Sequence, residues 1–157
     1  MMTNFPMNPK PVLLYSGAAN AVDCDVISTK YAHKVWFIVH HDGANDTDLT
    51  LSLYESDNVA KNDTAAVTTA CPFWLDSDVG TSSDTLVKQT DAYAFTIDPA
   101  TQADVLAVLE VDPAILSDGY PCVFLSDANG HGSNTCEIYA LVEMRNTQET
   151  PPSVLTD

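Results

Sequence analysis

The chain has 157 residues, 45% of them hydrophobic, which is enough to bury the core of a single folded domain. Lys and Arg total 6 and Asp and Glu total 22, and the net charge of −16 disfavours binding to nucleic acid or to an anionic membrane. No run approaches the roughly 18 apolar residues of a membrane span, and "MMTNFPMNPKPVLLY" at the N-terminus has no apolar core of a secretory signal.

Apolar residues recur with a period of two along most of the chain, which is typical of β-strands. The segments with this pattern, each bounded by Asp, Asn, Gly or Pro, are 12–15, 23–28, 34–41, 49–55, 66–75, 91–97, 104–111, 120–126 and 135–145. About eight to nine short strands at this spacing predict an all-β domain over residues 12–146. We expect an antiparallel β-sandwich of the jelly-roll or Greek-key type.

The two ends differ from the middle of the chain. Residues 1–11 contain Pro6, Pro9 and Pro11, which are poorly compatible with a central strand, and residues 147–157 form a similar polar tail. We therefore predict extended N- and C-terminal arms. One interpretation is that both arms simply fray, and the other is that they lie across a neighbouring subunit.

The segment "HHDGANDTD" follows the most apolar predicted strand and has the composition of a metal site. In a regular strand, however, His40 and His41 point to opposite faces, so they cannot bind the same ion. The Asp spacing also lacks the pattern of a calcium-binding loop. We predict a hairpin turn that uses Gly43 and Asn45 and leads into strand 49–55, with a bound cation as the alternative.

A second hairpin is predicted in "SDANGHGSNTC", because Asn129–Gly130 is a strong turn signal. This pairing would place Cys122 opposite Cys136, close enough for a disulfide. Buried reduced thiols are preferred for all four cysteines, since no secretory signal is present. "GHGS" does not have the context of a nucleophile loop, and we predict no catalytic, cofactor-binding or metal-binding residue.

The segment "DPAILSDGY" predicts one short turn of helix, with Asp112 as cap, Pro113 at the first position and Gly119 as the stop. The aromatic residues of the predicted strands are expected to pack in the core, whereas a sugar-binding platform would require several of them on one exposed face. These residues are Trp36, Phe37, Phe73, Trp74, Tyr93, Phe95, Phe124 and Tyr139.

Across residues 13–146 the chain resembles small structural proteins of tailed bacteriophages. The resemblance lies in "KVWFIVHH" followed by a turn and an alternating strand, in "CPFWLDSDVGTSSDT", and in "VLEVDPAILSDGY" before the closing "CEIYALVEMR". Such proteins are similar to head decoration, or cement, proteins. None of these segments is a catalytic motif.

The resemblance implies a virion protein that binds the outer surface of the capsid and stabilises it by bridging neighbouring major capsid proteins. It also implies assembly in the host cytoplasm and a homo-oligomer, with a trimer favoured. Contacts to the capsid or to another subunit would then fall on the N-terminal arm, at Asn4, Phe5, Pro6, Met7, Pro9 and Pro11. Three alternatives remain: a carbohydrate-binding sandwich, another phage component of the neck or tail, and a metal-assisted hydrolase that uses the histidines.

Overall fold

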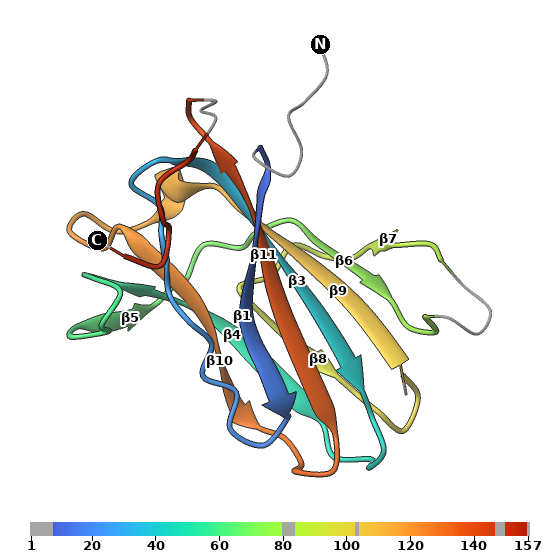
Figure 1. Ribbon diagram of the computed structural model, residues 1–157. Coiled ribbons are helices and arrows are strands. Elements are labelled where there is room, and N and C mark those ends of the chain that lie inside the picture. Colours follow the sequence, from blue (N-terminus) through green and yellow to red (C-terminus); the bar gives the residue numbers. More distant parts are fainter. Residues whose placement is uncertain (1–7, 80–83, 103, 147–149, 157) are drawn as a thin grey trace.

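The structure is a computed structural model that describes residues 8–79, 84–102, 104–146 and 150–156 (Figure 1). Within these ranges the chain forms eleven strands and one short 3-10 helix. The elements are β1 (Lys10–Ala18), β2 (Ile27–Ser28), β3 (Ala32–Asp42), β4 (Leu49–Ser56), β5 (Thr64–Ala66), β6 (Phe73–Asp76), β7 (Val87–Lys88), β8 (Ala94–Ile97), β9 (Asp104–Val111), η1 (Pro113–Ile115), β10 (Cys122–Asn129) and β11 (Thr135–Met144). In the described ranges no helix is long and apolar enough to cross a membrane.

Two antiparallel sheets form the predicted sandwich. The first has six strands in the order β1-β11-β3-β9-β6-β7, and the second has the order β2-β10-β4-β5, with β8 also paired to β4. The pairs β1–β11, β2–β10, β3–β9 and β4–β8 are those of one long hairpin folded over on itself. This is the jelly-roll arrangement, here with β5, β6 and β7 inserted between β4 and β8. The predicted fold class is confirmed.

Both predicted hairpins are wrong, because the strands on either side of each turn belong to different sheets. β3 pairs with β11 and β9, whereas β4 pairs with β10, β5 and β8, so residues 43–48 cross from one sheet to the other. Residues 130–134 cross in the same way between β10 and β11. Two alternating segments around a polar turn have the same pattern in a hairpin and in such a crossing, and only the long-range pairing distinguishes them.

The side chain of Asn134 joins the two crossings. It is fully buried, and its Oδ1 accepts a hydrogen bond from the backbone N–H of Asn45 at 2.7 Å. Its Nδ2 donates to the carbonyl oxygens of Asn45 at 2.9 Å and Thr47 at 3.4 Å. The acidic turn is therefore held by a buried amide.

Three further differences concern the shorter strands. The predicted strand 66–75 is two strands, since β5 pairs with β4 in one sheet and β6 pairs with β9 in the other. Only the last two residues of the predicted strand 23–28 form β2, and the two-residue β7 was not predicted. Strands this short carry too few residues for alternation to identify them.

The core lies between the two sheets. On β3 the buried side chains alternate with half-buried ones, and Phe37 is among the largest fully buried residues. Leu49, Leu51 and Leu53 of β4 face Phe37 from the opposite sheet and are fully buried. Each such side chain contributes roughly 1.5–3 kcal/mol through burial. Phe73 and Phe95 stack with ring centroids 4.7 Å apart.

The predicted helical turn is present as η1. The Asp112 side chain caps it by accepting a hydrogen bond from the backbone N–H of Ala114, and Pro113 is its first residue. The helix ends at Ile115, before the predicted stop. Gly119 has a φ of +88°, a conformation that a residue with a side chain rarely adopts.

The chain ends pack along the same side of the sandwich. β1 begins at Lys10 as an edge strand, which accommodates Pro11. At the other end, Val154 is only 2% exposed, and its carbonyl oxygen accepts a hydrogen bond from Ser28 at 2.7 Å. Lys10 Nζ donates to the carbonyl oxygen of Pro152 at 2.8 Å. Residues 150–156 therefore lie against their own domain.

Candidate protein-binding face

The six-stranded sheet turns one face toward the core and the other away from it. Among the described residues no element lies over the outward face (Figure 1). The strand register places five apolar side chains in one row across five strands, each directly opposite the next. This row is Leu13, Tyr139, Ile38, Val108 and Trp74. Leu13 is 51% exposed and Tyr139 is 38% exposed, and the other three are half-buried.

Four more apolar side chains extend this row. Pro11 lies opposite Leu141, which lies opposite Trp36, and Leu106 adds to the other side of the row. We call the nine residues the apolar face: Pro11, Leu13, Trp36, Ile38, Trp74, Leu106, Val108, Tyr139 and Leu141. A continuous exposed patch of this kind is typical of an interaction site in a folded protein.

Charged and titratable side chains border the apolar face at both ends of its central strands. On β11 the outward positions are Glu137, Tyr139, Leu141 and Glu143. On β3 they are Lys34, Trp36, Ile38 and His40, and on β9 they are Asp104, Leu106, Val108 and Glu110. Each strand thus has two apolar positions between two polar ones. An apolar centre with a polar rim is the usual anatomy of a protein interface.

Trp36 is held in place by its neighbours on the rim. Its Nε1 donates to Glu110 Oε2 at 2.9 Å, and Lys34 Nζ donates to Glu110 Oε1 at 2.7 Å while lying 5.8 Å from the Trp36 ring. Burial raises the pKa of the Glu110 carboxyl, but hydrogen bonds from Lys34 and Trp36 outweigh it and lower the pKa below its usual value. The hydrogen bond to Glu110 raises the pKa of Lys34.

Trp74 has a similar arrangement at the other side of the apolar face. Lys88 lies opposite Trp74 in the register, and its Nζ is 4.9 Å from the centroid of the Trp74 ring. The same ammonium group forms an ion pair with Asp91. Both tryptophans are therefore bordered by lysines that already have acidic partners.

The second sheet provides an internal contrast. Its outward positions on β4 include Thr50 and Ser52, and the Thr50 hydroxyl lies 2.9 Å from the Thr96 hydroxyl of β8. Tyr54 stacks on Phe124 at 5.5 Å, and Lys61 lies over the Phe124 ring. This sheet follows the usual pattern of apolar residues inward and mostly polar residues outward. The apolar face is thus a property of one sheet and not of the whole surface.

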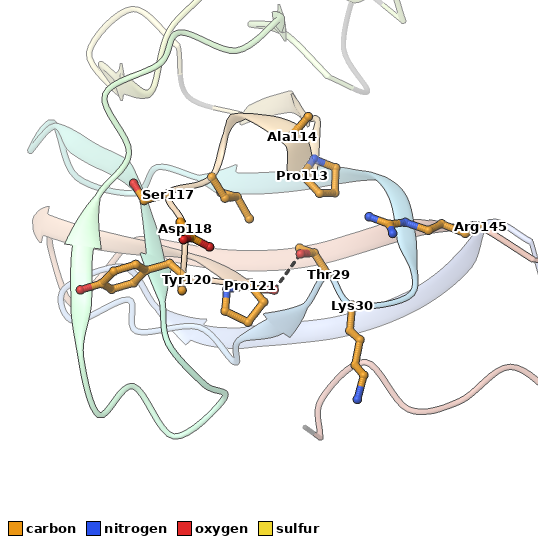
Figure 2. A pocket seen from close by; sticks show the side chains of 11 residues that line it. Thr29, Lys30, Pro113, Ala114, Ser117, Asp118, Tyr120, Pro121 and Arg145 are labelled. Atoms are coloured by element: carbon orange, nitrogen blue, oxygen red, sulfur yellow. Dashed lines mark hydrogen bonds between the residues drawn. The ribbon is translucent and has the colours of Figure 1, made fainter.

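A hollow of about 440 Å³ lies at the end of the sandwich where η1 leads into β10 (Figure 2). Arg145 and Lys30 lie on one side of it, and Asp118 and Tyr120 lie on the other. Thr29 Oγ1 donates to the Pro121 carbonyl oxygen at 2.7 Å, and this hydrogen bond joins two segments that line the hollow. The described residues that line the hollow include neither His nor Cys.

The histidines do not converge. His40 Nε2 lies 2.8 Å from Asp104 Oδ1 on the outward face, whereas His41 is fully buried in the core with both ring nitrogens unpartnered. Burial lowers the pKa of His41. His131 Nδ1 accepts a hydrogen bond from the backbone N–H of Ser133 in an exposed turn. The predicted placement of His40 and His41 on opposite faces of the strand is confirmed. The described residues contain no group of three His, Cys, Asp or Glu side chains arranged to hold a metal.

The four cysteines, all within the described ranges, are buried and form no disulfide. Cys122 on β10 lies opposite Ser28 and Ser56, whereas Cys136 on β11 lies opposite Gly17 and His41 in the other sheet. The predicted cross-strand pairing of Cys122 with Cys136 is therefore wrong. Burial raises the pKa of Cys136 to about 12. The Cys24 sulfur accepts a hydrogen bond from the Leu125 N–H at 3.1 Å.

Of the contact residues predicted on the N-terminal arm, Asn4, Phe5, Pro6 and Met7 lie outside the described residues. Pro9 is half-buried next to β1, and Pro11 is exposed at the border of the apolar face. The rest of this face is not predicted, because strand 34–41 is apolar on both faces and its sequence does not show which face is covered. The available signal was the contrast between strand 34–41, with Trp36 and Ile38 at the outward positions, and strand 49–55, with Thr50 and Ser52.

The aromatic residues divide between the two faces. Phe37, Phe73, Phe95 and Phe124 are buried, as expected for core packing. Trp36, Trp74 and Tyr139 lie instead on the apolar face, and Tyr93 is 47% exposed. Core packing is therefore the wrong expectation for both tryptophans and for Tyr93 and Tyr139.

No family model and no curated protein matches the chain. Among solved structures, the chain is similar to the "Crystal structure of SPBc2 prophage-derived protein YomS", with a TM-score of 0.48 and 10% sequence identity. The similarity covers 85% of this chain and 92% of that chain. At this level of likeness the comparison carries no argument about function.

Proposed function

We propose that the chain is a structural protein of a bacteriophage particle. It binds the outer surface of the capsid and stabilises the shell by bridging neighbouring major capsid proteins, and it is not an enzyme. The observation that carries this proposal is the apolar face, which gives the jelly roll a binding surface on one sheet. The sequence resemblance to decoration proteins supports the identity of the partner.

The size of the apolar face suits the core of a protein interface. Five strands about 4.8 Å apart, with about four residues of about 3.3 Å each, span roughly 20 Å by 13 Å, or about 250 Å². A standard interface buries about 800 Å² per partner, of which the apolar centre is one part and the polar rim another. One copy contributes modest area, and many copies on one shell act together.

The arrangement of the chain end fits the same role. β1 forms the border of the apolar face, and the predicted contact residues Pro9 and Pro11 lie at its start. Residues placed along an edge strand are available to a neighbour. The proposal includes a homo-oligomer, with a trimer favoured, at the outer surface of the virion.

The test uses particles of the phage that encodes the chain, purified with the gene intact and with the gene deleted. The chain should be present in many copies on intact particles, and particles from the deletion should lose their DNA at a lower temperature or a lower external force. A fluorescent DNA-binding dye in a heating ramp measures this release. Absence of the chain from intact particles would contradict the proposal.

A second candidate function is carbohydrate binding, which the outward position of Trp36, Trp74 and Tyr139 favours. Sugars stack on such rings, but the Trp36 N–H is already bonded to Glu110, and Lys34 and Lys88 lie beside the two tryptophans. Tryptophan fluorescence titrated with a panel of soluble oligosaccharides tests this function. A saturable change that Trp36→Ala removes would favour it over capsid binding.

A further inference from the structure

The rim of the apolar face restricts which partner it fits. We infer that the partner is a different protein, with an apolar centre flanked by Lys or Arg side chains on both sides, and not a second copy of this chain. This inference rests on the proposed function, since it specifies the surface that the capsid protein presents. It is carried by the charges that remain unpaired on the rim.

Most rim charges already have a partner within the chain. Lys34 is paired with Glu110 at 2.7 Å, and Lys88 is paired with Asp91. His40 lies 2.8 Å from Asp104. Both lysines of this rim are thus matched to an acid among the described residues, and neither is left to receive an acidic group from a partner.

Two rim acids form no ion pair within the described residues. Glu137 accepts hydrogen bonds there from the hydroxyls of Ser16 and Tyr139, both at 3.4 Å. Glu143 lies opposite Lys34 in the register, but the Lys34 ammonium is bonded to Glu110, so this one lysine faces two acids. Both are on β11, one on each side of Tyr139 and Leu141. Burying them under a partner requires compensating positive charge, because an unpaired carboxylate in an interface is costly.

The spacing of the two glutamates predicts the spacing of the basic groups. Glu143 follows Glu137 by six positions on β11. An antiparallel strand rises about 3.4 Å per residue, so the two carboxylates are about 20 Å apart along the strand. The partner should therefore carry basic side chains about 20 Å apart, with an apolar surface between them that covers Tyr139 and Leu141.

A second copy does not meet this requirement. Two copies packed through the apolar face would bring Glu137 and Glu143 of both copies into one interface, and the described residues offer no lysine on either rim that is not already paired with an acid. Each copy also has a net charge of −16, so their overall approach is repulsive. Like charges that face each other across an interface disfavour that pairing, which here is the pairing with a second copy. A protein with basic side chains around its apolar centre is therefore the partner that fits.

The experiment measures rebinding of purified full-length chain to particles from the gene deletion, over a range of NaCl concentrations. Three double variants are compared with the unchanged chain: Glu137→Lys with Glu143→Lys, Glu137→Gln with Glu143→Gln, and Asp46→Lys with Asp118→Lys. The last is a matched control, since it makes the same change in net charge at two exposed acids away from the apolar face. Thermal melts confirm that each variant is folded.

The lysine variant of the rim should bind at least about tenfold more weakly than the matched control, and the glutamine variant should bind with a shallower dependence on salt. Equal binding by the lysine variant and the control would overturn the inference while the proposed function stands. The inference would also be overturned, and the proposed function would stand, if sedimentation shows that the unchanged chain dimerises and that Ile38→Lys abolishes the dimer. Failure of the unchanged chain to bind at all would overturn the proposed function and the inference with it.

Discussion

The buried imidazole of His41 gives the sharpest prediction about stability. It is fully buried between Cys136 on β11 and Val105 on β9, and neither ring nitrogen has a hydrogen-bond partner. A neutral imidazole has one donor and one acceptor, and leaving such groups unsatisfied in a core costs about 1–3 kcal/mol. His41→Leu is close in volume and removes both groups. We expect it to raise the free energy of unfolding by about 1–2 kcal/mol at pH 7.5.

The same substitution should change how stability depends on pH. Burial lowers the pKa of His41 in the folded chain below its ordinary value of 6.5, although Asp42 and Asp104 act in the opposite direction. Above pH 6.5 the imidazole is neutral in both states and has no pH effect. Below it, the unfolded chain binds a proton that the folded chain does not. Stability then falls by up to about 1.4 kcal/mol per pH unit until the pH reaches the lowered pKa.

Urea unfolding followed by tryptophan fluorescence, at steps from pH 7.5 to pH 5, measures both effects. The advantage of His41→Leu over the unchanged chain should grow as the pH falls below 6.5. At pH 7.5 the melting temperature should rise by roughly 2–8 °C. Ile38→Leu, on the outward face of the same strand, changes no titratable group; it is the control and should leave the pH dependence of stability unchanged. Parallel pH curves for His41→Leu and the unchanged chain would refute the reasoning.

Three other predictions concern stability and the thiols. Asn134→Ala removes the buried amide that joins the two sheet crossings and should cost about 2–3 kcal/mol in urea unfolding; a loss below about 0.5 kcal/mol would contradict that role. Ile38→Thr with Val108→Thr, on the apolar face, should cost under about 1.5 kcal/mol. Val39→Thr with Ala107→Thr, on the inward face of the same strands, should cost at least about 3 kcal/mol, and equal costs would mean that both faces are covered. All four thiols should react with Ellman's reagent in denaturant and none rapidly in the native state, because all four are buried and burial raises the pKa of Cys24, Cys71 and Cys136; fewer than four would indicate a disulfide.

The sequence was sufficient to predict the sandwich because its strands alternate clearly. Leu49, Leu51 and Leu53 are all fully buried, and the cap at Asp112 forms as predicted. These features depend on residues close together in the chain, where local preferences decide the outcome. The jelly-roll class was predicted on the same strand count and spacing.

Pairing partners could not be predicted in the same way. Residues 34–41 and 49–55 alternate on both sides of an acidic turn, as the strands of a hairpin do. In the structure, the partners of β3 are β11 and β9, about 100 and 70 residues away in sequence. Which distant strand pairs with which is decided by how the two sheets close over a shared core, and no local pattern records it.

The candidate site was missed for a related physical reason. Alternation shows that Ile38 and Val39 point in opposite directions, but it does not show which of the two directions is covered. Since β3 is apolar on both, the simplest interpretation was a strand covered on both sides. Only the structure shows that Phe37 and Val39 face the second sheet while Trp36 and Ile38 do not.

The acidic charge of the chain counteracts the tendency of its apolar face to self-associate. An exposed apolar face on a flat sheet favours self-association, because two such faces would bury each other. The net charge of −16 opposes this approach, and the unpaired Glu137 and Glu143 make the close contact unfavourable in particular. A partner with basic groups at those two positions meets neither obstacle. The same acidity that opposes contact between two copies through the apolar face would therefore select the surface to which this face binds.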